Sequence, residues 1–391
     1  MESREAGWNT FIWFLGFDFC ITRMTISLSK SDAAPAKKRP ALISFKRGVP
    51  LTEKIFFIQN LQVMVRTGIS LAAALRTLSD QSSNGRFRTV INAIQDKVEK
   101  GQSFSSALSD YPYIFPDLMV SMIESGELSG KLEEVLTQLT NQLKKDHELI
   151  AKVRGAMMYP AIVIIAMAGI GTAMMIFVIP RLIGIFEEFR ATLPLPTRIL
   201  IAVSNFLTTH GIFVLIGAAL LVTGLRLFAR TEKGKRIFHG MLLHAPIFGG
   251  IVKKVNLARI SRTFSSLLST DIPIVQTALI SSRTVNNVYY RDSLTDLSER
   301  LKKGSQVHQV FESYPRLYPP VVTQLARVGE ESGALENVLV ELAAFYEEDI
   351  DQIMKNLPSI IEPLLILVLG AGVGAMAIAI IMPMYSLTQS I

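Results

Sequence analysis

The chain has 391 residues, of which 49% are hydrophobic and 19% are charged. It is too long for one ordinary core, and this mixture is typical of a membrane protein with substantial water-exposed parts. The net charge of +7 and the pI near 9.4 are compatible with binding to nucleic acid or to an anionic membrane surface. The single cysteine, Cys20, excludes a disulfide framework or a multi-cysteine metal site within one chain.

Residues 1–50 are expected to form an N-terminal tail, uncertain in structure or disordered. The stretch from Trp8 to Ile21 is apolar and aromatic, but Asp18 interrupts it and it is short for a membrane span. Met24 stays open as an alternative start of translation. The segment 27–47 is rich in Ser, Ala, Pro and Lys, which predicts a flexible chain.

The segments 51–156 and 226–357 are each predicted to be a helical bundle. Apolar residues in the first recur at spacings of three and four, the period of an amphipathic helix, and period-two strand patterns are lacking. The stripes are Leu61, Met64, Val65 and Gly68; Phe87, Val90, Ile91, Ile94 and Val98; and Leu132, Val135, Leu136, Leu139 and Leu143. The expected fold class is therefore all-α, with two bundles large enough for hydrophobic cores.

Three long apolar stretches, at 157–180, 199–225 and 358–383, predict three transmembrane helices. A helix crosses the hydrocarbon core with roughly 20 apolar residues, and each stretch reaches that length. Prolines are expected to mark the span boundaries, at Pro160, Pro180 and Pro383.

Basic residues near the span ends predict the orientation. They cluster before the first span and after the second, whereas the tail 384–391 has none. We therefore expect a multi-pass protein of the cytoplasmic (inner) membrane, with both bundles cytoplasmic and with the loop 181–198 and the C-terminus outside. The basic excess then reflects topology and contact with membrane lipids. No basic motif interleaved with aromatic residues appears, so nucleic acid is not an expected partner.

One phrase occurs twice, as SGELSGKLEEVL at 125–136 and as VGEESGALENVL at 328–339. Gly126 and Gly329 are 203 residues apart, and residues 53–188 match 256–391 at this offset without a gap. Each copy is thus one soluble domain followed by one membrane helix. The middle span lies outside the repeat and returns the chain to the cytoplasm, so both copies point the same way. Other aligned pairs are Lys100 with Lys303, Tyr111 with Tyr314, Pro116 with Pro319, Pro160 with Pro363, and Pro180 with Pro383.

The segment from Gly126 to Lys131 is superficially similar to a phosphate-binding loop, but its spacing is wrong. Such a loop has four residues between its glycines and a Ser or Thr after the lysine, whereas here there are three and Leu132 follows. The second copy has Ala334 in place of the lysine. We therefore expect no cofactor, and no metal site either, because the five histidines form no compact ligand pattern.

Glu127 and Glu330 raise the alternative of a catalytic carboxylate pair, one from each copy. No nucleophile beside a base, ligand cluster or oxyanion signature accompanies them, so no catalytic residue is assigned and no enzyme is expected. The favoured interpretation is a turn between helices, and a direct contact with a partner or an ion stays open. In this turn Gly126 and Gly329 end one helix, Ser129 and Ser332 cap the next, and Glu133 and Glu336 add first-turn charge. The signature residues are Gly126, Glu127, Ser129, Gly130, Leu132, Gly329, Glu330, Ser332, Gly333 and Leu335.

Glu362 precedes Pro363 at the entry to the third span. An ionisable residue at a membrane edge is costly unless it is paired, so Glu362 is a candidate functional residue; the alternative is that it only reaches the headgroup zone. Gly370 and Gly374 form a GxxxG spacing, which permits close packing of helices.

Copy one carries Lys144 and Lys145 where copy two carries Glu347 and Glu348. Opposite charges at equivalent positions favour contact between unlike copies, within or between chains. Two solvated faces are the alternative interpretation, and the favoured one.

The paired motifs GELSGKL and GEESGAL resemble the signature of the type II secretion system F family. The Lys-Gly, Tyr-Pro and proline landmarks of both copies, Glu362-Pro363 and the segment 381–383 also match, and the resemblance covers about residue 50 to the end. It implies an inner-membrane platform protein of a type IV pilus, competence or type II secretion machine. The implied partners are a hexameric assembly ATPase, pilin or pseudopilin subunits, other inner-membrane assembly proteins, and further copies of the chain in a homo-oligomer of two or more.

The expected function is thus pilus biogenesis or protein secretion without catalysis, in which the platform couples the ATPase to insertion of pilin into the fibre. The exposed faces around 126–130 and 329–333 are the expected partner or inter-domain surfaces. The alternative is a membrane enzyme or transporter with a site among the transmembrane helices. The polar residues singled out in the spans are sparse for such a site: Thr172, Asn205, Thr208, Thr209, His210 and the edge residue Glu362.

Overall fold

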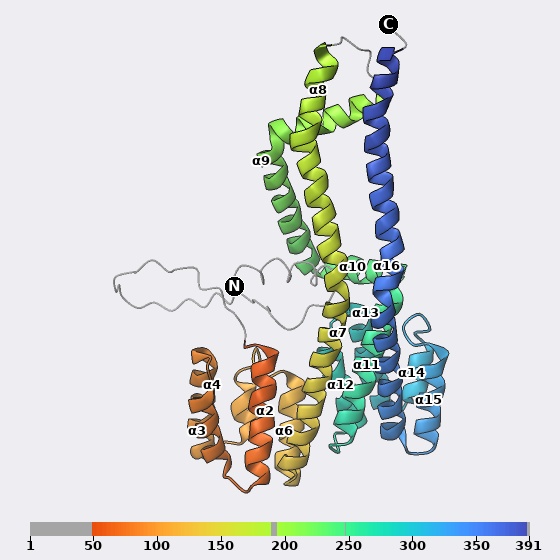
Figure 1. Cartoon of the computed structure of the whole chain (residues 1–391). Helices are drawn as coiled ribbons and strands as arrows, with labels where there is room; N and C mark the ends of the chain where they lie inside the picture. The colour runs from red at the N-terminus through yellow and green to blue at the C-terminus, as the bar shows by residue number, and fades with distance from the viewer. Residues whose placement is uncertain (1–48, 189–193, 247, 389–391) are drawn as a thin grey trace, which may run out of the picture. The chain divides into compact units, whose positions relative to one another are not determined.

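A computed structural model of the chain describes residues 49–188, 194–246 and 248–388, within which every regular element is a helix and there is no strand (Figure 1). Side chains at 184–188 and 383–388 are not described. The all-α prediction is confirmed. The predicted tail, apart from Val49 and Pro50, lies outside the described residues, as do Cys20 and Met24.

The chain divides into two compact units, which are considered separately. The first unit comprises the chain up to Ile150 together with Phe238–Ile350 and holds the helical bundles of both copies. The second comprises Ala151–Ile237 and Asp351–Ile391 and holds the apolar helices.

Copy one of the repeated domain is a helical bundle. Its helices are α2 (Leu51–Arg66), α3 (Leu71–Gln81), α4 (Gly85–Glu99), α5 (Phe104–Ser109), α6 (Asp117–Ser129) and the first part of α7 (Leu132–Ala173). Side-chain oxygens of Ser70, Asn84 and Ser103 accept N–H groups at the starts of α3, α4 and α5, which explains why these helices begin where they do.

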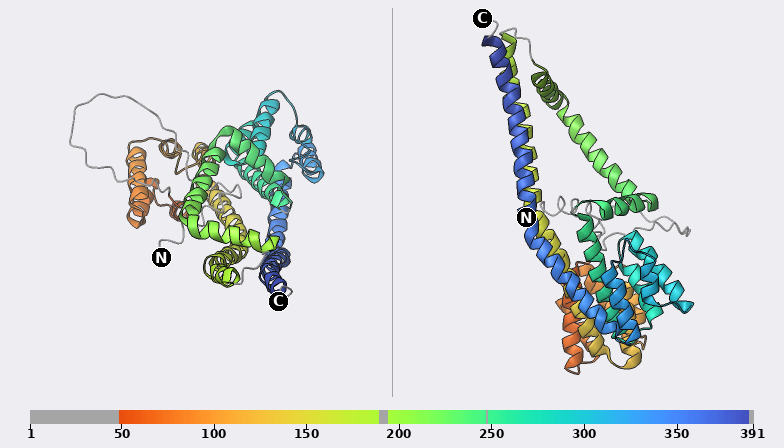
Figure 2. Two further views of the ribbon diagram at one scale, coloured as in Figure 1. Left: turned by 90° about the horizontal axis from the view of Figure 1, so that it is seen from above. Right: turned by 90° about the vertical axis from the view of Figure 1, so that its right-hand side faces the viewer.

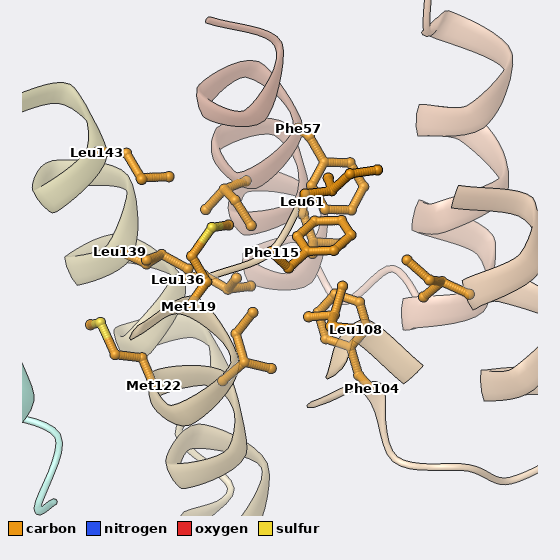
Figure 3. Close-up of a cluster of buried hydrophobic side chains, with 14 of the residues drawn as sticks. Phe57, Leu61, Phe104, Leu108, Phe115, Met119, Met122, Leu136, Leu139 and Leu143 are labelled. Atoms are coloured by element: carbon orange, nitrogen blue, oxygen red, sulfur yellow. The ribbon is translucent and has the colours of Figure 1, made fainter. Parts of the chain in front are cut away.

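The stripes predicted from the sequence form the core of copy one (Figure 3). Phe57 and Leu61 from α2 meet Phe104 from α5 and Leu136 from α7, and all four side chains are buried. Burying apolar side chains of this size is worth about 1.5–3 kcal/mol each, and this term holds the helices together. Gly68 does not join the core: it follows the end of α2 with a positive φ of 80°.

Copy two repeats this bundle. Its helices are α11 (Phe248–Leu268), α12 (Ile274–Thr284), α13 (Val288–Lys302), α14 (Val307–Glu312), α15 (Pro320–Glu331) and the first part of α16 (Leu335–Thr388). The bounds of α12, α13 and α14 are those of α3, α4 and α5 moved by 203 positions, which is the offset found in the sequence. The duplication is therefore one of structure as well as of sequence. A further helix, α10 (Glu232–His244), precedes copy two.

Three helices are long and apolar enough to cross a membrane, as predicted. They run within Leu132–Ile183, Leu195–Arg230 and Leu335–Met382. The first includes a π-helical turn, η1 (Met174–Val178), before α8 (Ile179–Glu188). Pro160 and Pro363 lie inside α7 and α16, so these prolines do not end helices, although they can still mark a membrane border.

The connection predicted at 181–198 is largely helical in its described part, since α8 extends to Glu188 and α9 (Leu195–Arg230) begins at Leu195. The predicted middle span is not one straight helix. His210 has non-helical backbone angles (φ −115°, ψ 16°) and breaks α9 into two parts. Within the second unit, the part of α9 before His210 lies across the ends of the other two apolar helices, whereas the part after it runs away from them (Figures 1 and 2).

Candidate functional site

Glu127, the acidic residue of the first signature, binds the start of a neighbouring helix. It lies on α6 and its carboxylate oxygens accept backbone N–H groups of Phe104 at 2.6 Å and of Ser105 at 2.8 Å. The hydroxyl of Ser105 also donates to it. Phe104 and Ser105 are the first two residues of α5, so Glu127 caps this six-residue helix from outside.

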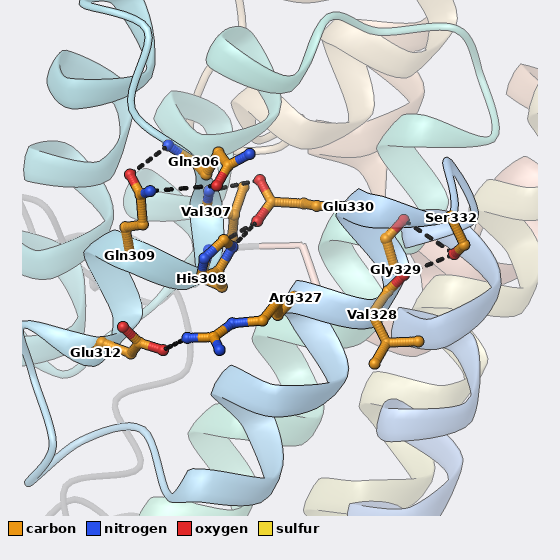
Figure 4. A network of polar contacts seen from close by, with 10 residues as sticks. All are labelled: Gln306, Val307, His308, Gln309, Glu312, Arg327, Val328, Gly329, Glu330 and Ser332. Carbon is orange, nitrogen blue, oxygen red and sulfur yellow. Dashed lines mark hydrogen bonds and ion pairs between the residues drawn. The ribbon is translucent and has the colours of Figure 1, made fainter.

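Glu330 makes the equivalent contacts in copy two (Figure 4). Its carboxylate accepts the backbone N–H groups of Val307 at 2.6 Å and of His308 at 2.9 Å, which begin α14. Nδ1 of His308 lies 2.7 Å from the same carboxylate. His308 stands 203 residues after Ser105, so a ring nitrogen replaces a hydroxyl at the same place in the bundle.

The reason for these contacts is that the first N–H groups of a helix have no partner within it. In α5 and α14 these groups meet a carboxylate, and a negative charge is favourable at the positive end of a helix. Each signature glutamate therefore fastens a short helix to the longer helix that follows it. The structural interpretation of the carboxylate pair accounts for both residues, each within its own copy.

The signature glycines have a different role from the one predicted. Gly126 and Gly329 lie inside α6 and α15 and do not end them, so that prediction is wrong. A Cβ at Gly126 would lie 3.0 Å from Cβ of Val135 on α7, and one at Gly329 would lie 2.9 Å from Cα of Leu335 on α16. These glycines let two consecutive helices cross in contact.

The rest of the signature makes the turn itself. Gly130 and Gly333 have positive φ angles of 72° and 68°, so they terminate the helices. The hydroxyls of Ser129 and Ser332 donate to carbonyls of the preceding turn, those of Ser125 and Val328, so the prediction that they cap the next helix is wrong. Leu132 and Leu335 are the first residues of α7 and α16. Glu133 and Glu336 occupy the first turns of these helices, as predicted.

A charged cluster joins the two copies within the first unit. Nζ of Lys145 lies 3.7 Å from a carboxylate oxygen of Glu347, which also pairs with Arg262. Opposite charges therefore meet between unlike copies, and the alternative of two solvated faces is wrong for this pair. Nearby, Asp146 faces Arg259 at 3.6 Å. Burial raises the pKa of the Asp146 carboxyl above its ordinary value, while the guanidinium groups of Arg259 and Arg262 oppose that shift.

In the second unit, two hydroxyls of α9 compensate for two prolines. Ile179 donates its N–H to the carbonyl of Met174, five residues earlier, in the π-helical turn η1. In the same register, the carbonyl of Met175 would accept the N–H of residue 180. That residue is proline, which has no N–H. The hydroxyl of Ser204 donates to this carbonyl instead, at 2.6 Å.

The same arrangement occurs at the equivalent proline of copy two. Pro383 lies in α16, where its missing N–H leaves the carbonyl four residues earlier, that of Ala379, without its helical donor. The hydroxyl of Thr197 donates to this carbonyl at 2.6 Å, and Thr197 and Ser204 are both buried. An unpaired carbonyl in an apolar environment is costly, so the two hydroxyls bind α9 to both other apolar helices.

The remaining membrane candidates have no comparable contacts. Glu362 and Pro363 lie on α16, and Glu362 forms no ion pair or hydrogen bond with a described residue. A Cβ at Gly370 or Gly374 would meet open space in the single chain. Over the described ranges, three or more His, Cys, Asp or Glu side chains nowhere gather as they would around a metal ion.

A duplicated helical bundle with three helices long enough to span a membrane defines a class, the polytopic membrane proteins built by repetition of one helical domain. Comparison with known families makes this specific. The sequence model described as "Type II secretion system (T2SS), protein F" matches residues 57–180 and again 260–383. The two matches are offset by the same 203 residues as the helices. The chain belongs to the type II secretion system protein F family.

Relatives of this chain have roles in two kinds of machine. It is 33% identical over 348 residues to the type IV pilus assembly protein PilC of Thermus thermophilus, an alignment that covers 89% of this chain and 85% of that protein. It is 28% identical over 360 residues to the type II secretion system protein F of Vibrio cholerae, covering 92% and 88%. Identity to the type IV pilus assembly protein TapC of Aeromonas hydrophila is 30% over 356 residues, covering 90% and 86%.

Four residues that matter in these sites were not singled out from the sequence: Ser105, His308, Thr197 and Ser204. Ser105 and His308 differ in type, so the repeat hides their equivalence unless the copies are aligned. Thr197 and Ser204 have a detectable signal, because a proline inside an apolar helix predicts an unpaired carbonyl that a nearby hydroxyl can fill.

Replacing Glu127 with glutamine is expected to destabilise the first unit by about 1–3 kcal/mol, because an amide nitrogen would then face N–H donors of α5. Urea unfolding of the purified protein measures this change, with the cleavage of copy one by trypsin as the probe of unfolding. Glu124→Gln is the matched control, since Glu124 is exposed on the same helix. Equal effects of the two substitutions would contradict the capping role.

Gly329→Ala is expected to lower the melting temperature of the protein in detergent, with a cost of about 1–3 kcal/mol from overpacking against the backbone of α16. Gly126→Ala is expected to cost less, because its nearest neighbour is the side chain of Val135. Gly85→Ala serves as the control, since a Cβ at Gly85 meets nothing within 4 Å. An unchanged melting temperature for Gly329→Ala would refute the close crossing.

Ser204→Ala is expected to destabilise the apolar helices by about 1 kcal/mol, and Pro180→Ala should reduce that cost because residue 180 then regains an N–H for Met175. Unfolding in mixed micelles of the two single variants and the double variant gives the coupling. Thr223→Val is the control, since its hydroxyl donates only within its own helix. Strict additivity would show that Pro180 and Ser204 do not share this carbonyl.

Proposed function

We propose that this protein is a non-enzymatic platform of the inner membrane for the assembly of type IV pili or of the pseudopili of a secretion machine. The observation that carries the proposal is the family match over both copies, together with relatives named for pilus assembly and for type II secretion. The role of the platform is mechanical: helical domains transmit movement, and no bond is made or broken.

The contacts of the signature residues support a platform over an enzyme. Glu127 and Glu330, the two carboxylates that a catalytic interpretation would use, are each occupied by N–H groups of a short helix. Both belong to the internal framework of a bundle. Ser204 and Thr197, buried among the apolar helices, are likewise bound to main-chain carbonyls. These contacts favour a scaffold over the alternative of a membrane enzyme or transporter.

In the proposed topology both bundles lie in the cytoplasm and the C-terminus lies outside. Basic residues near the ends of the apolar stretches support this orientation. They include Lys144, Lys152 and Arg154 before the first apolar stretch and Arg226, Arg230 and Arg236 after the second. A cytoplasmic location would let the bundles engage a hexameric assembly ATPase. The apolar helices would then receive pilin or pseudopilin subunits from the bilayer.

The exposed tips of the signature turns are the proposed contact points for assembly partners. Leu128 is 83% exposed beside the buried Gly126, so the turn presents an apolar side chain to solvent while its neighbours hold the bundle. In copy two Glu331 takes the equivalent position, so the two tips differ in chemistry. Different partners, or different faces of one partner, would meet the two copies.

The proposal predicts that deletion of the gene abolishes surface fibres or secretion while prepilin processing continues, because the platform acts after the pilin is mature. Immunoblots for processed pilin and electron microscopy of fibres measure both outcomes in one strain. Restoration by the wild-type gene is the control. Normal fibres and normal secretion in the deletion strain would overturn the proposal.

A further inference from the structure

The two copies within one chain contact each other through different surfaces. Helix α6 of copy one packs against α12 of copy two, and Leu267, Ile272 and Ile280 of copy two join the core of copy one. The hydroxyl of Ser125 donates to the carbonyl of Thr270 at 2.5 Å. Apart from the ion pair between Lys145 on α7 and Glu347 on α16, the contact is head to tail, since copy one uses α6 and α7 and copy two uses α11 and α12.

A head-to-tail contact leaves one surface of each kind unused. On copy two, the open surface lies on α15 and α16 at the positions equivalent to α6 and α7. Leu118 and Met122 on α6 are buried, whereas their equivalents Val321 and Leu325 on α15 are exposed. Val328, the equivalent of Ser125, is 56% exposed. With Glu341 and Phe345 on α16, these residues form what we term the α15 face.

On copy one, the open surface lies on α2 and the turn that follows it, equivalent to α11. Phe56, Val63 and Ile69 are exposed there. They stand 203 residues before Arg259, Ser266 and Ile272, all of which lie in the contact with copy one. Together with Arg66, these residues form what we term the α2 face.

The α15 face and the α2 face are chemically complementary at two pairs of positions that meet in the existing contact. Ser266 donates to Gln142 at 3.1 Å, and the equivalent residues are Val63 and Phe345, which are both apolar and exposed. Ser269 donates to Gln138 at 3.0 Å, and the equivalent residues are Arg66 and Glu341, which carry opposite charges. At these two pairs of positions, polar partners inside the chain thus correspond to an apolar pair and a charged pair on its open surfaces.

We propose that a second copy of this chain binds here, with the α15 face of one molecule on the α2 face of the next. The geometry repeats between chains the contact that joins the two copies within each chain. Such an interface is heterologous, so the bundles assemble head to tail and alternate as copy one and copy two. The burial of Phe345 against Val63 supplies the apolar centre, and Arg66 with Glu341 fixes the register.

Cross-linking of the full chain in membranes tests this interface. Cys20→Ser removes the native thiol, and two differently tagged chains carry Val63→Cys and Phe345→Cys. A short bis-maleimide is expected to give a covalent pair that contains both tags. Within a single chain, Ser266→Cys with Gln142→Cys shows that the reagent spans the equivalent contact.

The matched control is Val340→Cys. Val340 is exposed on the same helix as Phe345, but its equivalent in copy one, Thr137, contacts Gln62 of its own copy. The interface predicts a mixed pair for Phe345→Cys and none for Val340→Cys. Three outcomes would each overturn the proposal. The first is an equal yield of mixed pair from Phe345→Cys and Val340→Cys. The others are cross-links only between the same position of two chains, and cross-linking of Val63→Cys only to a different protein.

Charge exchange at Arg66 and Glu341 gives a second test, read from the yield of the same cross-link. Glu341→Arg and Arg66→Glu are each expected to lower the mixed cross-link about tenfold, because like charges then face each other. The two substitutions together should restore it. Failure of the double variant to recover, in protein that still elutes as a folded species, would contradict the pairing.

The interface is independent of the machine that the platform serves. The cross-link is measured after expression in a host that lacks pilus and secretion genes, so it reports only on contact between copies of this chain. A negative cross-link leaves the platform function standing, and normal fibres in the deletion strain leave the interface standing.

Discussion

The first N–H groups of the six-residue helices α5 and α14 have no partners inside those helices, and a carboxylate from the next helix satisfies them in both copies. This contact fixes the short helix of each bundle to the longer helix that follows it. The same α6 or α15 that carries the glutamate also carries the glycine that lies against α7 or α16. One short stretch thus fixes a helix on either side of it, and α7 and α16 continue as apolar helices.

Duplication has produced two identical frameworks with different surfaces. The glutamate, both glycines and the leucine of the signature keep their places, because each is required by the backbone. Residues that face outward from the framework have diverged: Gln142 corresponds to Phe345, and Ser125 to Val328. Gln142 and Ser125 of copy one are polar and bond to copy two, whereas their equivalents Phe345 and Val328 are apolar and exposed. In the proposed interface between chains, this asymmetry gives the two copies different contact surfaces.

Much of the fold follows from the sequence alone. The spacing of Phe87, Val90, Ile91 and Ile94 predicts a buried helical stripe, and the structure buries all four residues. The offset of 203 predicts two equivalent bundles, and the helix bounds agree with it. These signals succeed because amphipathic period and repetition are properties of the chain itself.

Other features depend on contacts distant in the sequence. Nothing local shows that Glu127 reaches back 22 residues to Ser105, or that Gly126 lies inside a helix, since a glycine before a turn is also typical of a helix end. Gly211 follows the break at His210, but the run from 199 to 225 holds no proline and no charge, so it predicts one unbroken helix. The role of Thr197 depends on a carbonyl 182 residues away.

The central claim is that each signature glutamate holds a short helix of its own copy. Amide hydrogen exchange of the full-length protein tests this most directly, compared between the wild type and the Glu330→Gln variant. The account predicts faster exchange at Val307 and His308, with no change at Phe104 and Ser105 in copy one. Unchanged protection of Val307 and His308 in the variant would contradict it.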